Sequence, residues 1–77
     1  MYVVVLHRIR NAEAAMAAAQ ARLAEIEARL CEPEIYQDGN QETVATLLRE
    51  QAQLRRDLAS SEESWLEAVT AMESVQR

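Results

Sequence analysis

Two rows of apolar residues with a seven-residue repeat constrain the fold of this chain more than any other feature. Alternate steps of four and three residues from Val5 to Leu30 meet an apolar side chain every time. The first row is Val5, Ile9, Ala12, Met16, Ala19, Leu23, Ile26 and Leu30. A repeat kept over this length is typical of a helix that packs along one stripe, as in a coiled coil.

The second row follows the same rule and runs almost to the C-terminus. Its members are Val44, Leu47, Gln51, Leu54, Leu58, Ser61, Trp65, Ala68, Met72 and Val75, of which Gln51 and Ser61 are polar. The two rows therefore predict two long helices that pack against each other.

The stretch RLCEPEIYQDGNQET, residues 29–43, separates the rows and contains the only proline and the only glycine. Pro33 disfavours a helix at the residue before it and cannot donate a backbone hydrogen bond. The pair Asp38-Gly39 is a turn signal, and Asn40 or Asp38 can cap a new helix. We predict a bend, either a solvated connector or a partner-binding tip, in which Ile35 and Tyr36 fold back over the end of the apolar rows.

The fold class predicted is all-α, an antiparallel two-helix coiled-coil hairpin that forms a single domain over residues 1–77. Its helices are expected at about 6–31 and 41–75, with the bend at 32–40. A fold about residue 37 places Leu23 near Gln51, and it places Trp65 against the alanine-rich part of the first helix. The β-branched residues at 3–5 have low helix propensity, so the first residues are expected to fray or to pack irregularly.

The charge argues against a general binder of polyanions, because the net charge is −5 and the isoelectric point is about 4.8. Residues 32–43, the bend and the start of the second helix, are its acidic part, with Glu32, Glu34, Asp38 and Glu42 and no basic residue. Cys31 is the only cysteine, which excludes an intramolecular disulfide. The apolar run at residues 2–6 is much too short to span a bilayer. We expect a cytoplasmic protein without a membrane segment.

No group of residues has the pattern of a catalytic, cofactor or metal site. His7 has no nucleophile near it in the sequence, and the serines at 60, 61 and 64 have no neighbouring base. A single glycine cannot form a phosphate-binding glycine loop. We therefore expect no enzymatic activity, cofactor or metal ion.

Arginine spacing suggests one binding surface. Arg22 and Arg29 lie seven residues apart on one helix face, as do Arg49 and Arg56, and Arg55 is adjacent. We predict that Arg22, Arg29, Arg49, Arg55 and Arg56 form a basic patch, on the half of the hairpin nearer the bend, that contacts nucleic-acid phosphate.

A second kind of function is a structural hairpin that self-associates. Leu48, Leu66 and Val69 lie just beside the second row, and Ala45, Ala52 and Ala59 widen this apolar face. Such a face is what a four-helix homodimer needs.

The residues also resemble a known family. A heptad helix ending at Leu30 is followed by CEPEIYQ with Pro33 and Tyr36, then by a second helix with a late tryptophan in ESWLEAV. This arrangement, over about residues 9–75, resembles the C-terminal coiled-coil domain of bacterial ABC-F ATPases of the Uup and YheS kind.

The resemblance implies an auxiliary domain that follows two ATP-binding cassettes in the same polypeptide. It implies cytoplasmic proteins that act on or near the ribosome, with DNA binding by this domain in some members. The expected partners are therefore DNA or the ribosome, through RNA or a ribosomal protein. The acidic charge of the chain departs from the basic surface that phosphate binding favours.

Overall fold

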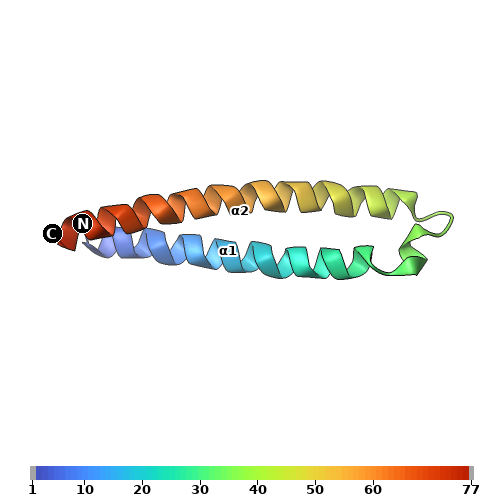
Figure 1. Cartoon of the computed structure of the whole chain (residues 1–77), viewed down its shortest axis with the longest axis horizontal. Helices are drawn as coiled ribbons and strands as arrows, with labels where there is room; N and C mark the ends of the chain where they lie inside the picture. Colours follow the sequence, from blue (N-terminus) through green and yellow to red (C-terminus); the bar gives the residue numbers. More distant parts are fainter. Residues whose placement is uncertain (1, 77) are drawn as a thin grey trace.

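The computed structural model describes residues 2–76 as a long, thin hairpin of two helices (Figure 1). Helix α1 spans Tyr2–Leu30, a short 3-10 helix η1 spans Pro33–Tyr36, and α2 spans Gln41–Gln76. The molecule measures 60 × 14 × 14 Å. The described residues contain no strand, and α1 packs against α2 along its length. This confirms the predicted all-α antiparallel hairpin; residues 1 and 77 of the predicted domain lie outside the described residues.

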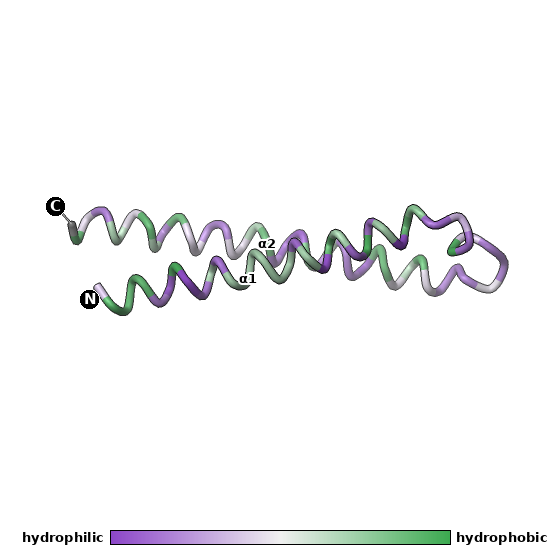
Figure 2. The backbone as a smooth tube through the Cα atoms, turned by 90° about the horizontal axis from the view of Figure 1, so that it is seen from below, coloured by the Kyte–Doolittle hydropathy of each residue, from purple (hydrophilic) through white to green (hydrophobic). Residues whose placement is uncertain are grey.

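The core is a single line of side chains between the helices, and it follows the two apolar rows. The buried residues of α1 are Val5, Ala12, Ala19, Leu23 and Ile26, and all belong to the first row. Leu47 and Ala68 are the buried side chains of α2, and both belong to the second row. In the hydropathy colouring of Figure 2, apolar and polar positions alternate along both helices rather than forming an apolar block. Each helix therefore buries only one stripe.

The densest part of the core lies beside the bend. Ile26, Ile35 and Leu47 form a buried cluster, and the half-buried Leu30 and Val44 pack against it. Ile26 is fully buried. The prediction that Ile35 folds back over the end of the rows is therefore confirmed.

The same prediction was wrong for the ring of Tyr36, which is 60% exposed. A 3-10 helix has three residues per turn, so neighbouring side chains point about 120° apart, and Ile35 already takes the inward position. The Tyr36 hydroxyl instead donates a hydrogen bond to the Leu30 carbonyl at the end of α1. It satisfies one of the carbonyl groups that a helix end leaves without a partner.

The turn into α2 follows the predicted chemistry. Gly39 has a backbone φ of +92°, a conformation that residues with a Cβ atom rarely adopt. Asn40 takes the N-cap position, since its carbonyl accepts the Val44 N–H at 3.1 Å. Its side-chain amide donates to the Glu34 carbonyl at 2.9 Å and so ties η1 to the start of α2.

The start of α1 differs from the sequence prediction. The helix begins at Tyr2 instead of near residue 6, and the stretch expected to fray is helical. Val5, only 4% exposed, lies in the interhelical core. Tertiary packing of this side chain outweighs the low helix propensity of valine, which costs only a few tenths of a kcal/mol per residue.

Candidate nucleic-acid interface

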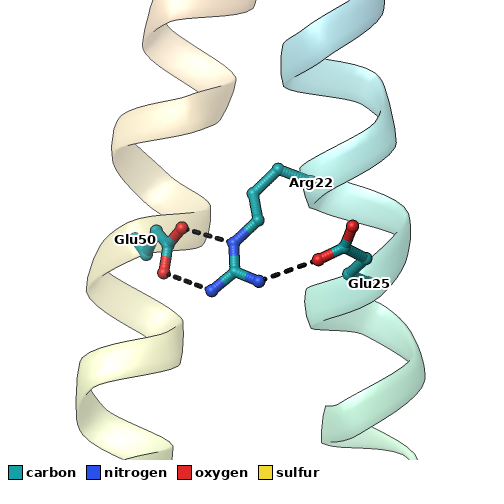
Figure 3. A network of polar contacts seen from close by, with 3 residues as sticks. All are labelled: Arg22, Glu25 and Glu50. Carbon is teal, nitrogen blue, oxygen red and sulfur yellow. Dashed lines mark hydrogen bonds and ion pairs between the residues drawn. The ribbon is translucent and has the colours of Figure 1, made fainter.

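Arg22 of α1 joins the two helices through a network of ion pairs (Figure 3). Its Nε donates to Glu50 Oε2 at 2.6 Å, and its Nη2 donates to Glu50 Oε1 at 2.9 Å. Its Nη1 also donates to Glu25 Oε2 at 2.9 Å. A two-point contact between a guanidinium and a carboxylate fixes both side chains more strongly than a single contact. This contact adjoins the predicted Leu23–Gln51 pair, so it supports the predicted register.

The network changes the acid-base behaviour of both partners. The hydrogen bonds from Arg22, together with its positive charge, lower the pKa of Glu50 below its ordinary value, although partial desolvation opposes them. The hydrogen bonds from Glu50 and Glu25 raise the pKa of Arg22, which keeps the arginine charged. Arg22 therefore uses its guanidinium group to hold the two helices together. Of the five arginines predicted to contact phosphate, it is the least available to bind nucleic acid.

The Arg22–Glu50 contact predicts a specific dependence of stability on pH. A carboxyl group whose pKa is lower in the folded state stabilises the fold above its unfolded pKa and loses this contribution as the pH falls through its folded pKa. We expect Glu50→Gln to lower the melting temperature at pH 7, and we expect the difference from the parent to shrink as the pH falls below about 4. Thermal melts followed by circular dichroism between pH 7 and pH 2 measure this. Glu63→Gln, at an exposed position, is the matched control, and an equal effect of both changes at pH 7 would contradict the prediction.

The three arginines of α2 are placed differently from Arg22. Arg49 Nη2 lies 3.4 Å from Glu42 Oε1 and 3.3 Å from Thr46 Oγ1, and Arg56 Nη2 donates to Gln53 Oε1 at 2.8 Å. Within the part of the chain that the structure describes, Arg55 makes no side-chain hydrogen bond or ion pair. All three are exposed, and the contacts of Arg49 and Arg56 stay within α2. None of these arginines joins α2 to α1.

Arg29 lies beside the bend. It lines a shallow hollow of about 160 Å³ together with Glu32, Glu34, Ile35 and Asn40. Glu25 lies four residues before Arg29 on α1, but its carboxylate contacts Arg22 instead. The structure thus separates the five arginines into Arg22 in the network, Arg29 beside acidic residues, and three exposed arginines on α2.

Glu50, the partner of Arg22 on the other helix, is a residue that the sequence pattern did not single out. The sequence does contain a pattern that indicates this contact. The predicted register places Leu23 of the first row near Gln51 of the second row, and Arg22 and Glu50 are the residues immediately before these two. In an antiparallel hairpin, residues at equivalent positions beside the rows lie on the same flank. The predicted register therefore indicates which charged residues of the two helices lie close together, as well as which apolar residues do.

The open end of the hairpin carries Trp65. Its ring is half-buried, and its Nε1 donates to Glu13 Oε2 at 3.3 Å. This contact supports the predicted position of the indole against the alanine-rich part of α1. On Arg8, Nη2 lies 3.9 Å from Glu67 Oε2, and both side chains are largely exposed, so this ion pair contributes little.

A groove of about 310 Å³ lies between the helices near this end. Its lining residues are Arg8, Asn11, Ala12, Ser60, Ser61 and Ser64. Small side chains on both helices, Ala12 on α1 and Ser61 on α2, face the groove and leave this space unfilled. The groove is open and all but one of its lining residues have polar side chains, unlike the hydrophobic and aromatic residues that line most small-molecule pockets.

Comparison with known proteins gives one result. The family model described as the ABC transporter C-terminal domain matches residues 6–68, which is most of the chain and includes the bend and most of both helices. No match is found among curated proteins or among solved structures. In the described residues, no helix has a long enough apolar stretch to cross a membrane.

Proposed function

Because the chain belongs to the family of ABC transporter C-terminal domains, we propose that it is a non-catalytic auxiliary domain of an ABC-F-type ATP-binding protein in the cytoplasm. In this proposal the hairpin assists the ATP-binding cassettes of the same polypeptide in associating with nucleic acid or with the ribosome. The cassettes supply ATP hydrolysis, and the hairpin supplies a long surface for contact.

The observation that carries this proposal is the exposure of Arg49, Arg55 and Arg56 on α2. Arg22 is used to hold the helices together, but none of the three has an ion pair that joins α2 to α1 among the described residues. Surface arginines that the fold does not require are available to bind phosphate, and their planar guanidinium groups suit phosphate oxygens. The patch available for nucleic acid is therefore these three residues.

The acidic bend supports a definite orientation of the hairpin. Glu32, Glu34, Asp38 and Glu42 are all exposed, and like charges repel a nucleic-acid backbone within about 10 Å at moderate salt. In the proposed complex the bend points away from phosphate, toward solvent or a basic protein surface such as a ribosomal protein. Binding of the isolated domain should be weak and should depend strongly on salt.

The test is a titration of labelled RNA and DNA with the 77-residue chain at two salt concentrations. We expect Arg49→Ala combined with Arg56→Ala to weaken binding and to reduce the salt slope by about 0.9 for each duplex phosphate that the variant no longer neutralises. Arg8→Ala combined with Arg10→Ala removes the same charge at the open end and is the matched control. The control should bind more tightly than the Arg49/Arg56 variant.

Two results would overturn parts of this proposal. Failure of the parent to bind RNA or DNA at low salt would remove nucleic acid as the direct partner of the isolated hairpin. Equal loss of binding in the control and the Arg49/Arg56 variant would show that only net charge matters and that α2 carries no patch.

A further inference from the structure

A second row of residues on α2 lies beside the interhelical core and is mostly exposed. It lies one residue after each member of the apolar row from Leu47 to Ala68, and it comprises Leu48, Ala52, Arg55, Ala59, Glu62, Leu66 and Val69. Consecutive residues of a helix are about 100° apart, so this outer row lies roughly a quarter turn from the interhelical core. Leu48 is 49% exposed and Leu66 is 59% exposed. Leucine side chains near both ends of the row are thus open to solvent.

The order of residues in the outer row is self-complementary. Read outward from Ala59 in both directions, Arg55 on one side corresponds to Glu62 on the other, and Ala52 corresponds to Leu66. The next pair is Leu48 and Val69. If two copies of α2 lie antiparallel with Ala59 against Ala59, each Arg55 therefore faces Glu62 of the other copy, which gives two pairs of unlike charges. Pairs of apolar side chains lie on both sides of these charged pairs.

The charged residues of the outer row are free to make this contact. Among the residues that the structure describes, neither Arg55 nor Glu62 makes a side-chain hydrogen bond or an ion pair. In a parallel arrangement Arg55 would face Arg55 and Glu62 would face Glu62, which like-charge repulsion disfavours. The charges therefore select the antiparallel orientation.

The outer side of α1 is compatible with the same arrangement. The equivalent row on α1 contains Ala17 and Ala24 together with Glu13, Gln20 and Glu27, and all five residues are exposed. The two alanines leave space between two copies of α1, while the longer polar side chains beside them mean that the contact surface lies mainly on α2. Each helix of a four-helix bundle meets two neighbours in directions about a quarter turn apart, which is the angle between the interhelical core and the outer row.

From these observations we infer that the outer row of α2 is a self-association surface whose partner is a second copy of this chain. The twofold axis passes near Ala59, and each Arg55 pairs with Glu62 of the second copy. The inference goes beyond the proposed function. In the dimer Arg55 contacts the second copy, so only Arg49 and Arg56 of the three-arginine patch remain for phosphate, and the two proposals can be tested with different variants.

The first test is sedimentation equilibrium of the whole chain without nucleic acid. We expect a dimer for the parent, and we expect Arg55→Glu and Glu62→Arg each to raise the dissociation constant at least about tenfold, because each puts two pairs of like charges together. The combined change Arg55→Glu with Glu62→Arg restores unlike pairs and should return the dissociation constant toward that of the parent. Arg56→Glu makes the same charge change outside the outer row and should leave association almost unchanged.

A second test locates the axis. With Cys31→Ser as background, Ala59→Cys should form a disulfide-linked dimer on mild oxidation, whereas Gln53→Cys, outside the outer row, should not. A monomeric parent at millimolar concentration would overturn the inference, and so would a double variant that associates no better than the single ones. Circular dichroism of each variant checks that the hairpin is folded, and cross-linking at Gln53 as readily as at Ala59 would place the interface elsewhere.

Discussion

Replacing Ile26 with alanine is expected to lower the free energy of unfolding by about 2 to 5 kcal/mol, the usual cost of truncating a large buried aliphatic side chain. Ile26 is the one large side chain that is fully buried among the described residues, and it joins Ile35 of η1 to Leu47 of α2. A single line of core residues cannot collapse far enough to fill the space left behind. A two-helix domain has little stability to spare, so this change should leave much of the chain unfolded.

Urea denaturation followed by circular dichroism measures this effect. Ile26→Val is expected to cost only about 0.5 to 1.5 kcal/mol, because it removes a single methylene. Val4→Ala truncates a residue of the same helix that is 61% exposed, and it should change stability little. Similar midpoints for Ile26→Ala and Val4→Ala would show that the buried cluster beside the bend does not hold the hairpin together.

Replacing Trp65 with alanine should have the second largest effect, about 3 kcal/mol, at the lower end of the range for aromatic truncations. The indole is half-buried rather than fully buried, which reduces the apolar area that the change exposes. Its hydrogen bond to Glu13, at 3.3 Å, is one of the contacts that tie α2 to α1 near the open end. The substitution should therefore destabilise the open end more than the bend.

Hydrogen exchange separates this effect from a general loss of stability. Protection of the amides near Ala12 should fall more in Trp65→Ala than protection near Ile26, which is far along the hairpin. Glu13→Gln keeps an acceptor for the indole N–H and should be much milder. Stability equal to that of the parent would show that the indole contributes nothing to the packing of the two helices.

The family and the fold follow from patterns that are local in the sequence. Val5 to Leu30 and Val44 to Val75 repeat with the helical period, while Pro33 and Gly39 interrupt the backbone for reasons that need no tertiary contact. The register follows too, because a bend of known position fixes which residues of two antiparallel helices are level. The Arg22–Glu50 and Trp65–Glu13 contacts agree with that register.

The candidate site was predicted less well. Spacing alone placed Arg22, Arg29, Arg49, Arg55 and Arg56 on helix surfaces, but it gave no means of deciding which arginine meets a carboxylate on the other helix. That choice depends on the flank to which each side chain turns once the helices are packed. Arg22 has Glu50 within reach across the interface, whereas Arg49 finds only residues of its own helix.

The sequence by itself determined two helices, their antiparallel arrangement and the position of the bend, because helix propensity, the apolar period and the Pro and Gly effects act over a few residues. Only the tertiary structure decided that α1 begins at Tyr2, that Ile35 rather than Tyr36 enters the core, and that Arg22 is bound to Glu50. Each of these depends on burial or on a contact between residues far apart in the chain. Such terms outweigh local preferences of a few tenths of a kcal/mol per residue, and they exist only after the helices have packed.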